Sequence, residues 1–566
     1  MSSTANTAPV LVVGNGPAGL IAALTLLRNG VPVRIIDKRD KYHAGQRGCG
    51  VQPRSLELYN LLGVPEIAKE GKLLMPMRNY GPIGSTTVVS EALMIPREED
   101  SPAKPYANGV LLGQHHSEEI IRAHVEKCGV FVELNTELVS VEQDSEGVIA
   151  RIIKNENGKK VEETVRTPFL IGADGGKGVS RKLLGLELSG ISRPSDRALV
   201  GDMYIKGLDS NYWHRWGDMA TKFITFRPTE FQDLWAVVLG SRDANYETLL
   251  TDREALKRFI EETTGRNDLI LLEIKELNEF SPNIRMVNEF GKGRCFLVGD
   301  SAHVHSPTGG QGMNSSVQDS LNLCWKLSLV YKGLAPISLL SSYTAERVPV
   351  IQEMLQQSTK LLNRIMTAKA KDHNTAAFVS RRPKSLDQLG VNYRWSNIVV
   401  DENKPYTEQL EGGALAAYGS DGDITLRAGD RAPEAPGLAI VNAKATESDS
   451  TTSLFSIFRP TLHTALIFVA DVSAAKSILD IVAKWPKGTI QTVVVLPKDA
   501  DQIKLTRDKV DAIVVTDRQG HAYDAYGSVV SNGFPIVIVR PDGVIGAIVK
   551  GTDGVVKYEK GIFLSV

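Results

Sequence analysis

The sequence contains few cysteines and almost no net charge, and both shortages exclude classes of function. Its four cysteines, Cys49, Cys128, Cys295 and Cys324, are scattered through 566 residues. Because they lack the paired spacing of a disulfide framework or a zinc site, we expect reduced thiols and no metal centre. The 65 basic residues nearly balance the 66 acidic ones. This balance gives no reason to expect nucleic acid or an anionic membrane surface as a partner.

Long apolar runs are also absent. The longest of them, such as residues 465–472, are much shorter than the roughly 20 residues that span a bilayer. Residues 1–8 lack the charged and then apolar layout of a secretory signal. We therefore expect no membrane segment and a cytoplasmic location. A chain of 566 residues exceeds the size of a single core, so it should fold into two or three domains.

The first pattern that points to a ligand lies in residues 10–37. Residues 10–13 form an apolar run typical of a buried strand, GNGPAG supplies a G-x-G-x-x-G turn, and an Ala/Leu-rich helical pattern follows. A second apolar strand, residues 33–36, ends at an acid placed to meet a ribose hydroxyl. Such an acid favours FAD or NAD over NADP, and the full pattern disfavours a glycine-rich turn without a ligand. The nucleotide-binding candidates are Gly14, Gly16, Pro17, Ala18, Gly19, Asp37 and Lys38.

A second strand, loop and helix occupy residues 294–331. The apolar run 295–298 stops at Gly299 and Asp300, where a strand would end and a ligand crevice would open. The glycines of PTGGQGMN then break regular structure, and we expect Asn314 and Ser315 to cap the following helix. Taken alone, this unit could be an ordinary connection between a strand and a helix.

Residues 167–175 give a third apolar strand that ends in an acid, Asp174, and glycines. Three such strand ends in one chain are hard to explain as independent accidents. Between the first and third, SEEIIRAHVEKCG predicts an amphipathic helix with Ser117 as its N-cap, just after Gln114. The sequence has no second G-x-G-x-x-G between a strand and a helix, which excludes a flavin-disulfide-reductase-like arrangement with two nucleotide domains.

The short motifs GD, SAHVHSP and GGQGMN occur in that order in residues 299–314. Together they resemble the second flavin-binding motif of the single-component FAD-dependent aromatic hydroxylases, and of the phenol hydroxylase-like members in particular. The resemblance implies that Asp300 holds a ribityl hydroxyl of FAD. It also implies that the next loop lies along the isoalloxazine ring, beside Gly299. The residues of that loop are Pro307, Gly310, Gln311, Gly312, Met313 and Asn314.

Other segments resemble further parts of the same family. AGQRGCGVQPRSLEL implies that Arg47 and Arg54 contact the flavin or pyrophosphate, although each could instead be a solvated surface arginine. Gln114 matches a glutamine beside the ribityl chain, with a solvent-facing loop residue as the alternative. Asp174 matches an acid that serves the FAD pyrophosphate and NADPH. The sequence departs from the family at Gly178, which stands in place of a serine, and at Cys49, where relatives place an aspartate beside the substrate.

Residues 198–241 have the period of strands separated by polar or proline-containing turns. The resemblance implies an antiparallel sheet over the flavin. The aromatic residues of this region, including Trp216, Phe226 and Trp235, either line the pocket or form the core of the sheet. The candidates for accepting or relaying a phenolic proton are Tyr204, Tyr212, His303 and His305, with Pro307 beside the reacting ring. The two histidines could instead brace the glycine loop.

The tail, residues 426–566, has strand patterns at 464–469, 492–495, 512–515 and 535–539. Their order resembles the thioredoxin-like tail of the same hydroxylases. Because no cysteine lies beyond Cys324, the tail cannot perform dithiol chemistry, and we expect a structural or associative role. We further expect a homodimer, and a flavin part that keeps FAD when the chain is cut after about Ala428.

These patterns predict an α/β fold in which a Rossmann-like FAD-binding domain carries an inserted antiparallel sheet and a C-terminal thioredoxin-like domain. The predicted units are residues 1–190 and 286–370 for the FAD domain, 191–285 for the substrate sheet, 371–425 for a connector and 426–566 for the tail.

The function implied by the resemblance is FAD-dependent monooxygenation of a phenol or a related small aromatic substrate. NADPH or NADH would reduce the flavin, O₂ would add at C4a, and the C4a-hydroperoxyflavin would transfer one oxygen. Epoxidation, Baeyer–Villiger insertion and oxidative decarboxylation use the same flavin chemistry and stay open. A flavin-binding interaction protein without turnover is the alternative from another class.

Overall fold

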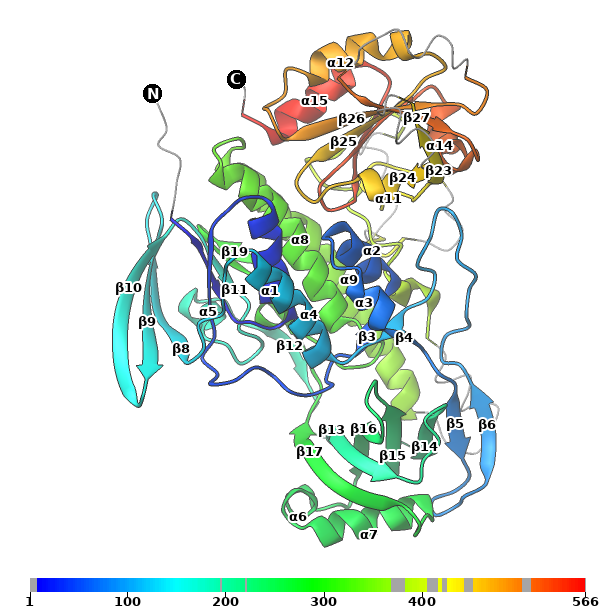
Figure 1. Ribbon diagram of the computed structural model, residues 1–566. Helices are drawn as coiled ribbons and strands as arrows, with labels where there is room; N and C mark the ends of the chain where they lie inside the picture. Colours follow the sequence, from blue (N-terminus) through cyan, green and yellow to red (C-terminus); the bar gives the residue numbers. More distant parts are fainter. Residues whose placement is uncertain are drawn as a thin grey trace.

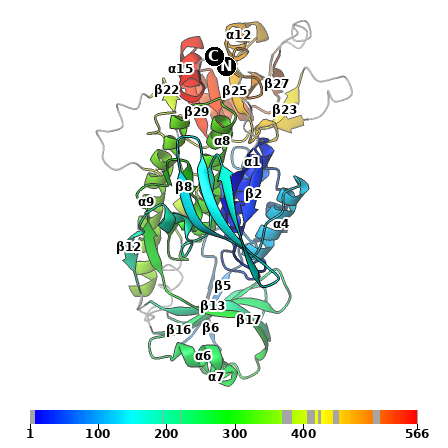
Figure 2. The ribbon, with the colours of Figure 1, turned by 90° about the vertical axis from the view of Figure 1, so that its left-hand side faces the viewer.

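The computed structural model describes residues 8–193, 196–218, 221–367, 382–404, 416–419, 425–441, 451–500 and 511–564. Three layers follow one another along the long axis of the molecule: a mixed C-terminal sheet, a central body around α1 and α8, and an antiparallel sheet at the opposite end (Figures 1 and 2). Among the described residues, no helix combines the length and apolar character needed to cross a bilayer.

The central body is built on a five-stranded sheet in the order β19-β20-β11-β1-β2. Its strands are β1 (Val10–Val13), β2 (Val33–Ile36), β11 (Leu170–Gly172), β20 (Cys295–Leu297) and β19 (Gly291–Lys292). All neighbours are parallel except β19. The register aligns Val13 with Gly172 and Gly172 with Leu297, so the three strand ends lie side by side. The three Gly/Asp segments therefore meet along one edge of the central sheet.

Helices cover this sheet because their apolar residues bury against it. They are α1 (Pro17–Arg28), α4 (Gln114–Lys127), α8 (Gly312–Tyr331) and α9 (Ser341–Thr367). Helix α1 packs on both α8 and α4, and α8 is buried along nearly all of its length. A helix that is buried on every side keeps its polar residues only if they find partners inside the protein. Those partners shape the site described below.

Three small sheets surround the body. They are formed by β8 (Thr136–Gln143), β9 (Val148–Glu156) and β10 (Lys159–Thr167); by β3 (Gly50–Val51), β7 (Val110–Leu111) and β4 (Lys72–Leu73); and by β12 (Ser189–Ser192), β18 (Asn283–Met286) and β21 (His303–Val304). The sheet of β3, β7 and β4 lies beside the glycine loop that precedes α8, because the Asn314 side chain in the first turn of α8 donates to the Gly50 carbonyl.

The antiparallel layer is a seven-stranded sheet in the order β17-β13-β16-β15-β14-β5-β6. Its strands are β13 (Ala198–Lys206), β14 (Trp213–Gly217), β15 (Lys222–Pro228), β16 (Leu234–Ser241), β17 (Ile270–Phe280), β5 (Met77–Tyr80) and β6 (Val88–Ala92). Strands β5 and β6 come from a part of the chain far from the other five. The β14–β5 pair is parallel, and the remaining pairs are antiparallel.

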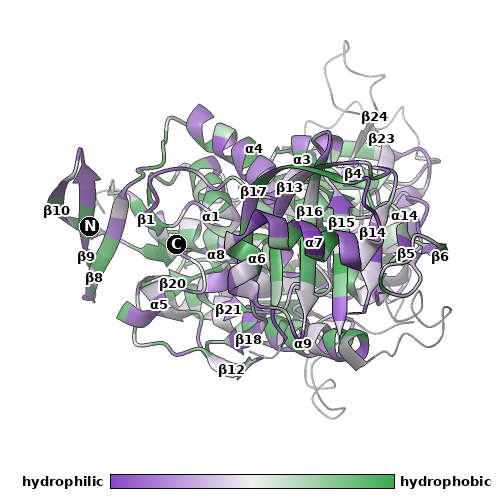
Figure 3. Ribbon diagram, turned by 90° about the horizontal axis from the view of Figure 1, so that it is seen from below, coloured by the Kyte–Doolittle hydropathy of each residue, from purple (hydrophilic) through white to green (hydrophobic). Residues whose placement is uncertain are grey.

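One face of this sheet is covered by α6 (Tyr246–Thr251) and α7 (Arg253–Thr264), which lie across the strands in Figure 3. Helix α7 begins at Asp252, whose carboxylate accepts hydrogen bonds from the first-turn N–H groups, and ends at Gly265 in the left-handed conformation. Trp216, Phe226 and Trp235 pack against these helices in one apolar core. These three aromatic residues are therefore core. The other face of the sheet is turned toward segment 46–50, since Asp202 on β13 accepts from the Gln46 N–H.

The C-terminal layer is an eight-stranded sheet in the order β22-β29-β28-β25-β26-β27-β23-β24. Its strands are β22 (Val400–Asp401), β23 (Pro436–Ile440), β24 (Thr451–Ser453), β25 (His463–Phe468), β26 (Ile490–Leu496), β27 (Ile513–Asp517), β28 (Ile536–Val539) and β29 (Ile545–Val549). The accompanying helices are α11 (Leu454–Ile457), α12 (Lys476–Val482), α14 (His521–Val530) and α15 (Thr552–Ile562). The four strands predicted in the tail are confirmed with small shifts at their ends. Strand β22 pairs with β29 although it precedes the predicted tail.

This layer is joined to the central body by buried charges. Arg540, in the turn after β28, forms ion pairs with Glu346 of α9 and with Asp542. Glu346 also pairs with Lys326 of α8 at 2.8 Å, and both of these side chains are fully buried. A cut after Ala428 would remove Arg540, one of the two cations that pair with the buried Glu346. The structure therefore argues against the expectation that the flavin part is separable at that point.

Candidate functional site

The G-x-G-x-x-G turn is shaped by close backbone contacts between β1, α1 and β11. Gly14 has φ +107°, and a Cβ there would lie 2.4 Å from the Ala173 carbonyl oxygen. A Cβ on Gly19 would lie 1.9 Å from the carbonyl oxygen of Gly14. No side chain fits either position without separating the helix from the sheet. Gly16 has open space beside it, as a turn that receives a ligand needs.

Asp37, at the end of β2, organises this turn. Its carboxylate accepts hydrogen bonds from the Asn15 backbone N–H at 2.9 Å and from the Arg39 backbone N–H at 2.9 Å. The Arg39 Nε also donates to it at 3.0 Å. Burial by itself would raise the pKa of Asp37, but the Arg39 side chain and the two N–H groups outweigh burial and lower it. The acid is therefore held ionised at the place that the pattern predicts.

Arg39 was missed by the sequence analysis, which named Lys38. Lys38 is exposed, whereas the Arg39 guanidinium contacts both Asp37 and the Asn15 side chain. The strand alternation contained the signal, since a residue two positions after Asp37 returns to the same side of an extended chain. The Asn15 Nδ2 is buried, and among the described residues it has no hydrogen-bond acceptor. It is a donor left open beside the glycine turn.

Asp174, just after β11, caps the short helix α5 (Ser180–Leu183). Its Oδ2 accepts from the Val179 N–H at 2.7 Å, the Ser180 N–H at 2.9 Å and the Ser180 hydroxyl at 3.0 Å. Its Oδ1 is buried without a partner among the described residues. A Cβ at Gly178 would lie 2.1 Å from the Asp174 Cγ. A serine at 178 would displace this carboxylate, which explains why glycine stands there.

The end of β20 brings the G-x-G-x-x-G helix α1 and the helix α8 together at Gly299. Gly299 has φ +61°, and a Cβ there would lie 2.6 Å from the Ser316 Oγ and 3.1 Å from the Ala18 Cβ. Helices α1 and α8 therefore meet at this glycine. The next residue, Asp300, belongs to the short turn η1 (Gly299–Ser301) and is exposed. Within the described residues its carboxylate receives no hydrogen bond, so it can accept one from a ligand.

The loop before α8 is held by Asn314. Helix α8 begins at Gly312 with Gln311 as its N-cap residue, so the prediction that Asn314 and Ser315 cap this helix is wrong. Asn314 instead lies in the first turn, where its amide donates to Gly50 O at 2.7 Å and Gly310 O at 2.8 Å. Its oxygen accepts from the Gln52 N–H at 2.8 Å. Cross-linking two loops satisfies the amide better than capping would.

The remaining loop residues divide into buried and open ones. The Gln311 amide is bonded to the 386–388 turn, donating to the Leu386 carbonyl at 2.9 Å and accepting from Gln388 at 2.8 Å. Pro307 is exposed, and its carbonyl accepts from the Gly310 N–H at 3.1 Å. The Met313 Cβ lies 3.6 Å from the position of a Cβ on Gly48. Segments 46–50 and 307–314 therefore face each other across a narrow space.

His303 cannot be the catalytic base. Its side chain is fully buried, and its Nε2 is 2.7 Å from Asp319 Oδ2. The Phe290 ring stacks on the imidazole at a centroid distance of 5.8 Å. A substrate cannot reach a fully buried ring whose Nε2 is bonded to Asp319 inside the protein. This part of the sequence prediction is wrong because local sequence does not reveal a partner sixteen positions away on another element.

Asp319 on α8 holds the His303 side chain, the Gly299 N–H and Arg347 together, and it was not among the residues predicted from the sequence. Its carboxylate also accepts from the Gly299 N–H at 3.1 Å and pairs with the Arg347 Nε at 2.7 Å. Burial by itself would raise the pKa of Asp319, but the charges of Arg347 and His303 outweigh it and lower the pKa. An acid inside an apolar helical run was the available signal, since a buried carboxylate needs partners.

His305 braces the loop from the other side. Its Nδ1 is 2.6 Å from the Ser306 carbonyl oxygen, and its ring fills the space in which a Gly312 side chain would stand. Burial lowers the pKa of His305. A neutral imidazole can accept a proton, so His305 stays a candidate for proton transfer, with its Nε2 toward the start of α8.

Strand alternation separates the two candidate tyrosines. Tyr204 on β13 lies two residues from Asp202, whose carboxylate accepts from the Gln46 N–H at 2.8 Å. Both side chains are therefore on the side of the sheet that faces segment 46–50. Burial raises the pKa of the Asp202 carboxyl. Tyr212 instead lies before β14 under the guanidinium of Arg78, at 3.5 Å from its ring centroid. Tyr204 therefore lies on the face that meets segment 46–50, and Tyr212 lies at the start of β14 beside β5.

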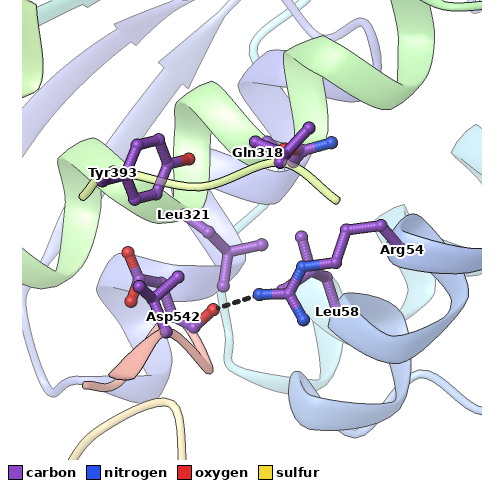
Figure 4. Close-up of a pocket in the computed structure, with 8 residues that line it drawn as sticks. Arg54, Leu58, Gln318, Leu321, Tyr393 and Asp542 are labelled. Carbon is purple, nitrogen blue, oxygen red and sulfur yellow. Dashed lines mark hydrogen bonds between the residues drawn. The ribbon is translucent and has the colours of Figure 1, made fainter. Parts of the chain in front are cut away.

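Arg47 and Arg54 have different surroundings. Arg47 is 59% exposed, and its guanidinium lies 3.7 Å from Glu276, so it is accessible to a ligand. Arg54, on α2 (Pro53–Leu61), is buried and donates to Glu57 at 2.8 Å and to the Asp542 carbonyl at 2.9 Å (Figure 4). The cavity beside it, about 10 Å³, holds at most one water. We therefore remove Arg54 from the flavin contacts, because it joins the central body to the C-terminal layer.

Gln114 is the first residue of α4, with Gly113 as N-cap, so the prediction that Ser117 caps this helix is wrong. Ser117 is buried inside the first turn. The Gln114 side-chain Oε1 accepts from the Gly48 N–H at 3.2 Å, and its Nε2 donates to Glu118 at 2.8 Å. Gln114 therefore supports the segment that faces Met313.

These features fit a long dinucleotide such as FAD. Asp37 stands at one end of a row of neighbouring strand ends, and the paired loops 46–50 and 307–314 stand at the other. Between them, Asn15, Asp174 and Asp300 present a donor and two acceptors that no described residue satisfies. Glycines along the row remove the Cβ atoms that would block a ligand. No group of at least three His, Cys, Asp or Glu residues in the described part of the chain could hold a metal ion.

Comparison with known proteins supports this assignment. Residues 7–358 match the family model described as FAD binding domain. The chain is 33% identical over 469 residues to a flavin-dependent monooxygenase of Mycobacteroides abscessus, covering 81% of this chain and 88% of that protein. It is 28% identical to pentachlorophenol 4-monooxygenase of Sphingobium chlorophenolicum, covering 95% of this chain and 93% of the relative.

The same fold occurs in the flavin-dependent monooxygenase PieE, solved in complex with FAD and substrate. The match has a TM-score of 0.80 at 22% identity and covers 98% of both chains. The family match and the sequence relatives together place the protein: it belongs to the FAD-dependent aromatic monooxygenases. It is an enzyme of that family, and FAD is its cofactor.

Proposed function

We propose that this enzyme uses NADPH or NADH and O₂ to add one oxygen atom to a phenolic or related aromatic substrate. The observation that carries the proposal is the pair of loops, 46–50 and 307–314, held face to face by Asn314 beneath the flavin-facing side of the antiparallel sheet. A flat ring between these loops would have the sheet above it, where an aromatic substrate can lie. Relatives named for chlorophenols support the substrate class.

Each end of the site has a distinct role in this proposal. Asp37 and Arg39 hold the adenosine part, the Asn15 amide donates to the pyrophosphate, Asp174 shapes the turn beside it, and Asp300 accepts from a ribityl hydroxyl. Gly310, Gly312 and Met313 lie along the ring, with Arg47 at the mouth. Bound FAD supplies the redox and oxygen chemistry, and the chain supplies binding, orientation and exclusion of water.

The chain must also handle the proton of a phenol. Tyr204 and Asp202 share the flavin-facing side of β13, and His305 stands behind the loop. A carboxyl whose pKa is raised by burial exchanges protons more readily near neutrality than an ordinary surface carboxylate. Asp202 therefore joins Tyr204 and His305 as a candidate for proton transfer, in place of His303 and Tyr212.

The overall organisation belongs to the same proposal. We propose that the sheet of β13–β17 is a substrate unit inserted into the FAD-binding unit and completed by β5 and β6. The sheet that contains β25–β29 is proposed to be a thioredoxin-like unit, which reaches back to β22 and serves a structural role. A homodimer stays a prediction, to be tested by sedimentation.

Aerobic consumption of NADPH and NADH by the FAD-loaded protein tests the function, with and without a panel of phenols. Products are analysed by mass spectrometry after reaction under ¹⁸O₂. We expect phenol-dependent consumption and one labelled oxygen in the product. Products of ring insertion or decarboxylation would favour the other oxygenations. No consumption with any phenol, in protein of full flavin content, would favour a flavin-binding protein without turnover.

A further inference from the structure

A second cavity lies beside the loop of residues 307–314, called the flavin loop from here on. Three of its lining residues are basic. It has a volume of about 500 Å³ and is lined by Ile95, Pro96, Glu98, Arg364, Arg382, Pro383 and Lys384. These residues come from the segment after β6, from the end of α9 and from the start of the turn η3 (Lys384–Asp387). A cavity of this size accommodates a small organic ligand.

The charges of this cavity do not cancel. Lys384 pairs with Glu98 at 2.8 Å, which satisfies the one acid in the lining. The guanidinium group of Arg382 is left without a matching acid in the lining. Apolar surface from Ile95, Pro96 and Pro383 lies beside it. The lining therefore suits a molecule that carries both an apolar ring and a negative group.

Arg382 connects this cavity to the flavin loop. Its Nη1 lies 3.7 Å from the position of a Cβ on Gly310, and its backbone N–H donates to the Met94 carbonyl at 3.0 Å. In the described part of the chain its guanidinium has no hydrogen-bond acceptor. Burial lowers the pKa of Arg382, and the nearby Cys49 thiol is the group that opposes this shift. A partly buried guanidinium without an anion is costly, and a bidentate carboxylate is the group that best satisfies it.

We propose that Arg382 binds an anionic group, a carboxylate or phenolate, on the aromatic substrate and so selects acidic substrates. This proposal rests on the proposed function, because it places the substrate beside the flavin loop. A nicotinamide cofactor could bring a phosphate to the same guanidinium. The apolar residues of the cavity and its position next to Gly310 favour the aromatic substrate.

The test measures binding of matched acids and amides to the FAD-loaded protein through the change in flavin absorption. The probes are salicylate against salicylamide and 3-hydroxybenzoate against 3-hydroxybenzamide. We expect at least one acid to bind about tenfold more tightly than its amide, as a charge-assisted pair allows. Arg382→Met should abolish this preference and leave amide binding within about twofold. Arg382→Lys should keep part of it.

Arg258→Met is the matched control, since this arginine lies on the surface of α7 and is 62% exposed. It should retain the preference for the acid. Flavin content and thermal unfolding verify that each variant is folded. The proposal is overturned if no acid is preferred, if Arg382→Met weakens acid and amide equally, or if Arg382→Met raises the KM for NADPH while the preference persists. Failure of NAD(P)H oxidation with every ligand would contradict the proposed function instead. The difference in binding between acids and amides would still decide whether Arg382 binds the anionic group.

Discussion

Arg540 and Glu346 form a bidentate ion pair that is fully buried between the C-terminal layer and α9. The Arg540 Nη1 is 2.8 Å from Glu346 Oε1, the Nη2 is 3.0 Å from Oε2, and both side chains have no exposed surface. Lys326 of α8 donates to the same carboxylate, and the Trp325 Nε1 donates to Asp542. The helix that begins at the flavin loop is thus fixed to the C-terminal layer by buried charge.

Arg540→Met should lower the free energy of unfolding by about 3–5 kcal/mol, because it leaves Glu346 buried with only part of its compensating charge. Denaturant unfolding measures this loss. The matched control is Arg151→Met, which removes an arginine from a pair with Glu162 whose side chains are both 52% exposed. That variant should lose less than about 1 kcal/mol. Equal losses in the two variants would show that the buried pair has no special role.

His463 makes the stability of the C-terminal layer depend on pH. It is buried among Trp325, Trp485, Tyr558 and Phe563, and burial lowers its pKa from 6.5 to about 4. Between these values the unfolded chain binds the proton and the folded chain does not, so folded stability falls as the pH falls. The loss should reach about 3 kcal/mol across this window.

His463→Gln removes the titrating group and should flatten this part of the curve relative to the parent protein. The comparison is made by denaturant unfolding at a series of pH values from about 4 to 7. Other acids contribute to both proteins alike, so the difference between the two curves isolates His463. Parallel curves would contradict the assignment.

Asp300→Ala should weaken FAD binding by about 1–3 kcal/mol, or roughly ten- to a hundredfold, because a buried ribityl hydroxyl would lose its acceptor. Titration of the apoprotein with FAD measures the dissociation constant. Asp40→Ala is the control, since this exposed acid lies three positions beyond Asp37 and off the row of strand ends. An unchanged constant in the Asp300 variant would remove this residue from the flavin contacts.

His303→Gln should reduce stability by about 1–3 kcal/mol without removing the pH dependence of oxygenation. The reason is that His303 bonds Asp319 inside the protein, and Asp319 in turn holds the Gly299 N–H. Thermal unfolding and the pH profile of kcat are measured on the same preparation. A normal unfolding curve together with a lost pH dependence near neutrality would restore His303 as the base.

The sequence by itself determined the parts of the site that depend on local backbone geometry. A buried strand that ends in glycine and acid leaves few conformations open, and Gly14, Gly299 and Gly310 occupy the left-handed or crowded positions that their neighbours impose. The three strand ends, the glycine loop, and the acids Asp37, Asp174 and Asp300 could therefore be read from short patterns. The order of the central sheet then brings them into one row.

Only the tertiary structure decided which polar side chains point into that row and which point away. Arg54 turns to Asp542 and His303 is buried against Asp319, although both looked equivalent to a ligand contact in the sequence. The sheet likewise divides its aromatic residues, with Trp235 in the core and Tyr204 on the opposite face. The physical reason is that the partner of a buried polar group lies far away in the chain, and no local period records where the fold will bring it.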